Sequence, residues 1–582
     1  MSITVTPDAN NISVREVLGE FDAEFKSIAQ AAGNGEFALW VGSGISRNAP
    51  DLGNLIELAF EYLRQKAVDP PSQKAFTRAL DEAVTLAGFD PVKLRLQYSV
   101  PFTDWYEKDE IVTELWNRYS DLLDIRIIGE RGDFVLWDAI DVRSAFANLG
   151  PPAATHLCIA ILIMEGAIKT VASANWDGFI EEAVARLGNC APGILQVIVD
   201  PNHLREPPAQ AKLLKFHGCV VYATKEPALF RKYLTGSRTQ ITEWPDNPEF
   251  ASMVNTVVNV ATNQKTMVLG LSIQDYNIHT VFSKAKQVHA WPWPCTPHAP
   301  GHVFCGDHIT NGQSSILKIV YGNAYDTHAV QIQFATHVRA WAEQVLIALV
   351  LKVLTDKLVH LMKSVLESLG LGSLQEPFQT SLICLRDLVA DLAVPDRTNF
   401  VNVAVTFWSR LLSIFRSGKL PANPQVYEAI SPYVASVVQG DANAVAAGLG
   451  SLGLILASLL NGKNNGAWEL QVPADANVAS GALTARANRA DAKDRPVFVV
   501  RSATEAIALQ KSGAFANNNA VVIHGDETWQ SLIGKKKSAR KPSSAPGRRG
   551  SIETTHISFV TLLSQITDAL ALQQKFAAEM ML

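Results

Sequence analysis

Short apolar runs alternate with helical patterns through the first 340 residues of the chain. Apolar residues recur at helical spacing over residues 13–32, which predicts an amphipathic helix, and the run FALWV then predicts a buried strand. The segment up to about residue 149 is predicted to be mostly helical. From residue 155, helices and β-branched strands follow in the order HLCIAILIMEG, KTVAS, GFIEEAVARLG, ILQVIV, KLLKF and KTMVLG. This alternation predicts an α/β domain over residues 1–340 with a doubly wound, mostly parallel sheet.

The hydrophobic pattern changes after residue 341. Three helical segments, AEQVLIALVLKVLTDKLVHLM, TSLICLRDLVADL and VNVAVTFWSRLLSIF, indicate a helical domain over residues 341–470. The first is apolar around most of its circumference, so we expect burial against its own domain, another subunit or both. A homo-oligomer is therefore expected. Residues 471–582 contain PVFVVR, ATEAIALQKSG and NNNAVVIHGD, which predict a small α/β unit.

The uncharged run at residues 442–462, ANAVAAGLGSLGLILASLLNG, is nearly long enough to cross a bilayer. Its Asn, Ser and Gly residues, and the absence of a basic flank, favour a buried helix pair over a membrane span. Within it, the letters GLGSLG match a dinucleotide fingerprint, but the required preceding strand is missing. Helix packing is therefore the favoured interpretation of these glycines.

Composition narrows the class of protein further. The 582 residues carry a net charge of −5 and a pI near 6.2, so no overall basic field attracts nucleic acid. Six cysteines without a Cys-x-x-Cys pair, and an N-terminus without a signal-peptide pattern, indicate the cytoplasm. Residues 534–550, GKKKSARKPSSAPGRRG, are predicted to be a flexible basic loop, either simply solvated or binding nucleic acid or an acidic partner.

Residue types that suit a ligand site follow four of the predicted strands. Gly42, Ser43 and Gly44 follow the first, where they either cradle a phosphate or form a tight turn capped by Ser46. The polar residues after three later strands are Asn175 and Asp177, then His217, then Ser272 and Asp275. Ligands of doubly wound sheets bind beyond the carboxyl ends of the strands, so these residues are expected to converge on one crevice.

Taken in order, these segments resemble the sirtuin (silent information regulator) family. GSGIS at residues 42–46 is similar to its Gly-Ala-Gly-Ile-Ser, and ANWD at residues 174–177 is similar to its Gln/Thr-Asn-x-Asp. KFHG at residues 215–218 is similar to the catalytic His-Gly, and GLS at residues 270–272 to Gly-Thr/Tyr-Ser. The resemblance covers about 230 residues and implies a Rossmann-like, sirtuin-type domain.

Two departures indicate a particular branch. Sirtuin deacetylases insert a four-cysteine zinc module between the His-Gly and Gly-x-Ser segments, whereas this chain has only Cys219 between His217 and Gly270. Residues 47–54 also lack the Gly-Ile-Pro-Asp-Phe-Arg segment of deacetylases. What remains resembles the bacterial sirtuin-like NAD hydrolases of phage defence.

That resemblance implies hydrolysis of NAD+ to nicotinamide and ADP-ribose, a reaction that generates an oxocarbenium-like sugar and needs a positioned water. His217 can accept a proton, Asn175 can orient the water or the carboxamide, and Asp177 can favour developing positive charge. The residues expected to hold NAD as substrate are Gly42, Ser43, Gly44, Ser46, Gly270, Ser272 and Asp275. Structural roles stay open, since an isolated histidine is often structural and Asn or Asp can cap a helix.

A separate cluster in WPWPCTPHAPGHVFCGDHIT has the residue types of metal ligands. Its members are Cys295, His298, His302, Cys305 and His308. Their spacing fits no common structural zinc pattern, and a proline-rich loop offers no helix to present them. No metal is therefore expected.

The leading functional hypothesis is a regulated NAD hydrolase that depletes NAD in antiviral defence by abortive infection. The resemblance implies a regulatory partner, such as an ATPase-translocase, a short Argonaute, a phage protein or a nucleotide signal. The first alternative is a non-catalytic sensor of NAD or ADP-ribose within a larger complex. A protein deacylase is the third possibility, and the missing cysteines disfavour it.

Overall fold

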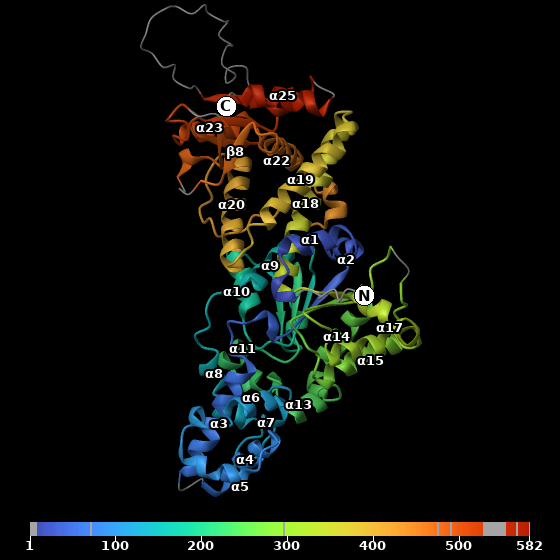
Figure 1. Ribbon diagram of the computed structural model, residues 1–582, viewed down its shortest axis with the longest axis vertical. Helices are drawn as coiled ribbons and strands as arrows, with labels where there is room; N and C mark the ends of the chain where they lie inside the picture. The colour runs from blue at the N-terminus through green and yellow to red at the C-terminus, as the bar shows by residue number, and fades with distance from the viewer. Residues whose placement is uncertain are drawn as a thin grey trace, which may run out of the picture.

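The computed structural model describes residues 8–69, 73–294, 297–473, 477–488, 492–527, 554–565 and 568–580. Figure 1 shows an elongated molecule with a parallel sheet at mid-height, a helical lobe below it, and long helices with a second sheet above it. The basic segment at residues 534–550 and Cys295 lie outside the described residues.

The first sheet has seven strands, all parallel, in the order β3-β4-β2-β1-β5-β6-β7. They are β1 (Phe37–Val41), β2 (Thr170–Ser173), β3 (Leu195–Ile198), β4 (Ala211–Lys215), β5 (Lys265–Leu269), β6 (His302–Cys305) and β7 (His337–Val338). The predicted α/β class and Rossmann-like parallel sheet are thus confirmed. The interpretation of residues 302–305 as loop was wrong: β6 pairs with β5 and β7, but its four residues, HVFC, follow a proline-rich segment and are too few to indicate a strand by themselves.

Helices cover both faces of this sheet. Phe37, Leu39 and Val41 pack on one side with α1 (Val14–Asp22), α2 (Lys26–Gly33), α9 (Ala154–Met164) and α10 (Phe179–Leu187). Ala38 and Trp40 point to the other side, toward α14 (Ala251–Asn263), α15 (Tyr276–Val288) and α16 (Asn311–Tyr321). Alternate residues of a strand face opposite ways, so a sheet buried on both faces reads as a continuous apolar run.

The single helix predicted over residues 13–32 is in fact two helices. The backbone leaves helical geometry at Ala23 (φ −112°, ψ −99°), between α1 and α2. Both helices contact α18 (Ala342–Ser368), a helix more than 300 residues later in the chain. The bend lets the apolar faces of both helices reach α18. It is therefore set by packing against a distant helix and not by the local sequence pattern.

A helical lobe is inserted between β1 and β2. Its helices are α3 (Leu52–Val68), α4 (Gln73–Leu86), α5 (Pro91–Leu94), α6 (Lys108–Trp116), α7 (Tyr119–Leu122) and α8 (Val142–Ala145). The lobe begins after the carboxyl end of β1 and lies below the sheet in Figure 1. Between β4 and β5 lie α11 (Val220–Lys225), α12 (Pro227–Phe230) and α13 (Arg238–Glu243), followed by α14.

The C-terminal half combines long helices with a mixed sheet. After α17 (Asn323–Thr336) and α18 come α19 (Gln375–Ala390), α20 (Arg397–Ser417), α21 (Ala442–Ala446) and α22 (Leu449–Asn464). The sheet, in the order β12-β11-β10-β9-β8, contains β8 (Trp468–Gln471), β9 (Leu483–Ala487), β10 (Arg495–Val500), β11 (Val521–His524) and β12 (Thr555–Ser558). Its helices are α23 (Ala503–Lys511), α24 (Phe559–Leu563) and α25 (Ala569–Met580). Helices and sheet share one hydrophobic core, which crosses residue 470.

The uncharged run at residues 442–462 forms the short helix α21 and most of α22; α22 is buried as predicted, whereas Ala444 is the one buried residue of α21. Gly450 faces α18 so closely that a Cβ atom there would lie 2.6 Å from the carbonyl oxygen of Leu361. These glycines therefore serve helix packing. Over the described ranges, no helix combines the length and apolar character that a membrane crossing requires.

Candidate functional site

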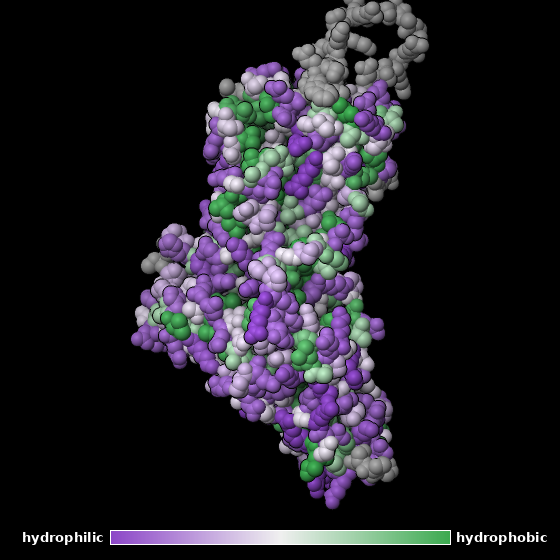
Figure 2. Space-filling view, turned by 180° about the vertical axis from the view of Figure 1, so that it is seen from behind, coloured by the Kyte–Doolittle hydropathy of each residue, from purple (hydrophilic) through white to green (hydrophobic). Residues whose placement is uncertain are grey.

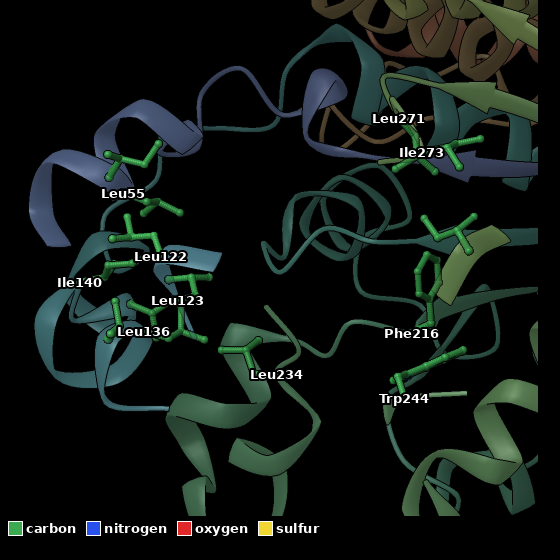
Figure 3. Close-up of a cluster of buried hydrophobic side chains, with 14 of the residues drawn as sticks. Leu55, Leu122, Leu123, Leu136, Ile140, Phe216, Leu234, Trp244, Leu271 and Ile273 are labelled. Atoms are coloured by element: carbon green, nitrogen blue, oxygen red, sulfur yellow. The ribbon is translucent and has the colours of Figure 1, made fainter. Parts of the chain in front are cut away.

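The turns after β1 and β5 meet at the point where the winding of the sheet reverses. From β1 the chain passes to β2 on one side, and from β5 it passes to β6 on the other. Ligands of open parallel sheets bind outside the carboxyl ends of the strands at such a point. In Figure 3, Leu122 and Ile140 of the helical lobe lie on one side, with Phe216, Leu271 and Ile273 at the sheet on the other.

The glycines after β1 and β5 allow two backbone turns to touch. The amide of Gly44 donates to the carbonyl oxygen of Gly270 at 2.9 Å. A Cβ atom on Gly42 would lie 2.7 Å from that oxygen, and one on Gly270, whose φ is +61°, would lie 2.6 Å from the nitrogen of Ile45. Close approach of backbone to backbone is thus sufficient to require these glycines.

The segment that follows Gly42 is a turn, and no α-helix begins directly after it. Ser43–Ile45 form a single 3-10 turn, and the next α-helix, α3, begins only at Leu52 with Asp51 as its N-cap. The N-terminus of a long helix is therefore not directed at this turn. Ser43 and Gly44 are nevertheless exposed, so this stretch of backbone is open to a ligand.

Asn175 and Ser46, both predicted site residues, share a buried hydrogen-bond network. Asn175 Nδ2 donates to the carbonyl oxygen of Gly42 at 3.1 Å and to Ser46 Oγ at 3.0 Å. Ser46 Oγ also lies 3.0 Å from His156 Nε2. Asn175 is 8% exposed and Ser46 is 4% exposed. The network ties the turn after β1 to the end of β2.

His156 is a site residue that sequence reasoning missed. It lies in the first turn of α9, an almost wholly apolar helix, and its side chain is fully buried. Burial lowers its pKa to about 4, although the charge of Asp177 acts in the opposite direction. The imidazole is therefore neutral at physiological pH. The one signal in the sequence is a histidine at the start of an otherwise apolar helix, and that signal is weak.

Asp177 acts as a structural cap. Its Oδ1 accepts a hydrogen bond from the amide of Phe179 at 3.1 Å, at the start of α10. Its backbone oxygen accepts a hydrogen bond from Lys215, whose ammonium group also lies 3.1 Å from Glu181 Oε1. Among the described residues, no hydrogen bond or ion pair joins its carboxylate to His217, Asn175 or Asp275.

His217 is joined to the segment after β5 by a hydrogen bond across the site. His217 Nε2 lies 2.9 Å from Asn277 Nδ2, and His217 Nδ1 lies 4.0 Å from Asp275 Oδ2. Because β2 and β1 separate β4 from β5, the two strands that lead to these residues lie three strand spacings apart, roughly 14 Å. The bond therefore joins two segments that start on opposite sides of β2 and β1.

The protonation of His217 is set by two opposing effects. Burial lowers its pKa, and the charge of Asp275 and the bond to Asn277 offset part of that shift. Asp275 is held in place by Tyr119 of the helical lobe, whose hydroxyl donates to Oδ1 at 3.0 Å and to Oδ2 at 3.2 Å. Neither Tyr119 nor Asn277 was predicted from sequence, because each lies outside the recognised motifs.

The segment that carries Ser272 and Asp275 is strained and braced. Ile273 has φ +57°, an unusual value for a β-branched residue and one that clusters at functional sites. Thr310 Oγ1 donates to the carbonyl oxygen of Ser272 at 2.7 Å, and Gln313 Nε2 donates to that of Leu271 at 2.8 Å. The start of α16 thereby holds this segment in its conformation.

The second candidate cluster does not assemble into a metal site among the described residues. His302 and Cys305 are buried in β6, and the ring of His302 is surrounded by Phe282, Trp291 and Tyr321. Burial lowers the pKa of His302 to about 3. Within the described ranges, no group of three or more His, Cys, Asp or Glu side chains is arranged to hold a metal ion.

Fold and site together define a class: a Rossmann-like α/β protein with a buried polar site at the carboxyl ends of its parallel strands. Comparison with protein-family models and with curated proteins finds no match to this chain.

Proposed function

We propose that this protein hydrolyses NAD+ to nicotinamide and ADP-ribose. The observation that carries the proposal is the His217–Asn277 hydrogen bond, with Asp275 4.0 Å from the imidazole, over the reversal point of a parallel sheet. A neutral, buried histidine beside a carboxylate suits proton transfer near neutral pH. The ordered match of four segments to sirtuin motifs supports NAD as the substrate.

Each site residue has a distinct task in this reaction. The bond between nicotinamide and ribose breaks, and its electron pair neutralises the nicotinamide ring, while the oxygen of a water molecule bonds to the ribose carbon. Neutral His217 takes the proton that the water loses at Nε2, which the Asn277 amide gives up when the substrate enters, and Asp275, 4.0 Å from Nδ1, stabilises the imidazolium that forms. Both N–H groups of the Asn175 amide are engaged, so its Oδ1 remains to accept a hydrogen bond from the water or the carboxamide.

Substrate binding falls mainly to the turns after β1 and β5. The backbone of exposed Ser43 meets the pyrophosphate beside Gly44, whose own amide is bound to Gly270, and Ser46 and Ser272 supply hydroxyl groups to the phosphates or riboses. Asp177, as a cap of α10, supports the site without taking part in the chemistry. Asp177→Asn keeps a capping side chain and is therefore a matched control.

The burial of the site supports regulation. Asn175, Ser46 and His217 are each at most 8% exposed, so NAD reaches them only if the structure around the site rearranges. We propose that the protein depletes NAD as an effector of antiphage defence, and that a partner or signal opens its buried site. The partner types that the sirtuin resemblance implies are an ATPase-translocase, a short Argonaute or a phage protein.

The test is nicotinamide release from NAD by the purified full-length chain, alone and with candidate partners. His217→Ala is expected to lower kcat by about two to four orders of magnitude, the usual effect of losing a general base. Asn175→Ala is expected to lower it similarly. Asp177→Asn and His308→Ala, a change at an exposed histidine, should retain activity.

Two outcomes would redirect the proposal. Unchanged kcat in His217→Ala would remove His217 from the mechanism. Binding of NAD or ADP-ribose without cleavage under any condition, including with partners, would favour a non-catalytic sensor.

A further inference from the structure

The orientation of the Asn175 side chain follows from one backbone acceptor. The carbonyl oxygen of Gly42 lies 3.1 Å from Asn175 Nδ2 and can only accept a hydrogen bond. A flipped amide would place two oxygens against each other. The Nδ2 group therefore faces Gly42, and its second hydrogen is the one directed at Ser46 Oγ, 3.0 Å away.

The tautomer of His156 follows in the same way from a backbone donor. The amide of Ala153 lies 3.1 Å from His156 Nδ1 and can only donate. Nδ1 must therefore be unprotonated, so in the neutral ring the hydrogen resides on Nε2. That hydrogen is directed at Ser46 Oγ, 3.0 Å away.

Ser46 Oγ thus receives two hydrogen bonds. A hydroxyl oxygen has two acceptor positions and one hydrogen to donate, so both acceptor positions are filled. Within the described residues, Ser46 Oγ has no further hydrogen-bond partner. A buried hydroxyl hydrogen without an acceptor is unfavourable, which makes it a donor waiting for a ligand atom.

We propose that His156 is a positioning residue that makes Ser46 a pure hydrogen-bond donor toward an oxygen of the bound nucleotide. The proposal rests on the proposed function in that the ligand is NAD or ADP-ribose. The accepting atom is a phosphate or ribose oxygen, since each accepts hydrogen bonds. Neutral His156 acts through Ser46 and does not itself meet the substrate.

A purely structural role predicts a different pattern of effects. The ring of His156 packs on Phe179 with centroids 4.8 Å apart, so removing it also disturbs packing. Thr155, its neighbour in α9, braces the same turn by donating to the carbonyl oxygen of Ile45 at 2.8 Å. Thr155→Val removes that brace and leaves the Ser46 hydroxyl alone, so it is the matched structural control.

The experiment measures dissociation constants for ADP-ribose by calorimetry, with thermal unfolding alongside, in the full-length chain. Ser46→Ala and His156→Phe are each expected to weaken binding about tenfold or more, the effect of losing one hydrogen bond to a charged or strongly accepting group. The double variant should bind no more weakly than either single variant, because His156 acts only through Ser46. His156→Gln, which keeps an N–H donor, should stay within about threefold of the unaltered chain.

Nicotinamide riboside, which lacks the pyrophosphate, distinguishes the two oxygens. Weakening by Ser46→Ala that is confined to ADP-ribose assigns the donor to a phosphate or the adenosine ribose, and weakening of both ligands assigns it to the ribose that carries nicotinamide. Thr155→Val should lower the unfolding temperature without changing either dissociation constant.

Several results would overturn the proposal. Additive effects of Ser46→Ala and His156→Phe, or equal losses in His156→Gln and His156→Phe, would show that His156 does not act through Ser46. If His156→Phe does not fold, the cycle is run with His156→Gln, and a tenfold loss in that variant would count against the proposal. Binding without NAD cleavage would contradict only the proposed function, whereas absence of any binding would overturn both.

Discussion

At the scale of single residues, the balance between burial and charge around His217 determines what the site can do. Burial opposes the imidazolium and lowers the pKa, while Asp275 and the bond to Asn277 favour the charged form. The net direction is downward from an ordinary value near 6.5. His217 is therefore neutral, and able to accept a proton, throughout the physiological range.

Asp275→Asn tests this balance through the pH dependence of NAD cleavage. Activity needs neutral His217, so kcat/KM should be level at neutral pH and fall as the pH drops below the lowered pKa. Removing the carboxylate removes an effect that raises that pKa, so the acid limb should move to lower pH. Its plateau should also fall, because the imidazolium loses its partner.

Tyr119→Phe is the control for that change, since it removes a hydrogen bond to Asp275 and retains the charge. Its acid limb should shift less. An acid limb that stays in place or moves upward in Asp275→Asn would contradict the role assigned to the carboxylate.

At the scale of elements, the contact between the turns after β1 and β5 restricts which residues the two turns can contain. Gly270 combines a left-handed backbone with a position where a Cβ atom would lie 2.6 Å from the nitrogen of Ile45 and 2.7 Å from the carbonyl carbon of Gly44. A weakened affinity for NAD in a variant of these glycines would therefore report on folding as well as on binding.

Gly270→Ala is expected to destabilise the protein by about 2 kcal/mol or more, since it adds a left-handed penalty to a steric overlap. Gly19→Ala is the matched control with the opposite expected effect on stability, because Gly19 lies inside α1 with nothing within 4 Å of a new Cβ atom. It should stabilise by about 0.5–1 kcal/mol through the helix propensity of alanine. Urea unfolding measures both; equal effects of the two changes would contradict the contact.

At the scale of the whole molecule, α18 packs against both halves of the chain. It contacts α1, α2 and α9 of the first half and α19 and α22 of the second. Its Lys357 forms a fully buried ion pair with Glu165, 2.6 Å apart, and Tyr427 donates to the same carboxylate at 2.6 Å. The apolar circumference predicted for this helix is therefore covered within one chain.

A second subunit is thus not required by α18, and the homo-oligomer stays a prediction without that support. On the face shown in Figure 2, hydrophobic residues lie scattered among hydrophilic ones along the length of the molecule. The predicted boundary at residue 340 likewise lies inside a continuous core, since α18 completes the core of the first sheet.

Deleting residues 342–582 is accordingly expected to give an insoluble or aggregated chain. The truncation uncovers apolar faces of α1, α2 and α9 and leaves the buried carboxylate of Glu165 without its cation. Size-exclusion chromatography and circular dichroism measure the outcome. Lys357→Met in the full chain isolates the ion-pair contribution and should cost about 3–5 kcal/mol. A soluble, folded monomer of residues 1–341 would contradict this view of α18.

Local pattern is sufficient to predict β1, β2, β4 and β5 and the polar residues at their ends. Buried parallel strands are short, apolar and β-branched, and polar residues follow them directly in the chain, so both properties are encoded within a few positions. For the same reason, the amino-acid sequence by itself singles out Asn175, His217 and Asp275 as candidate site residues.

Tertiary structure alone decided the partners of those residues and the core that surrounds them. Ser46 meets His156 across 110 positions, His217 meets Asn277 across 60, and Asp275 meets Tyr119 across 156. It also decided β6, whose short run HVFC follows a proline-rich segment and forms a strand by pairing with β5 and β7. The bend at Ala23, which fits α1 and α2 to α18, is a further example. Hydrogen bonds and packing between distant segments depend on where the whole chain places them, and no local period of hydrophobic residues carries that information.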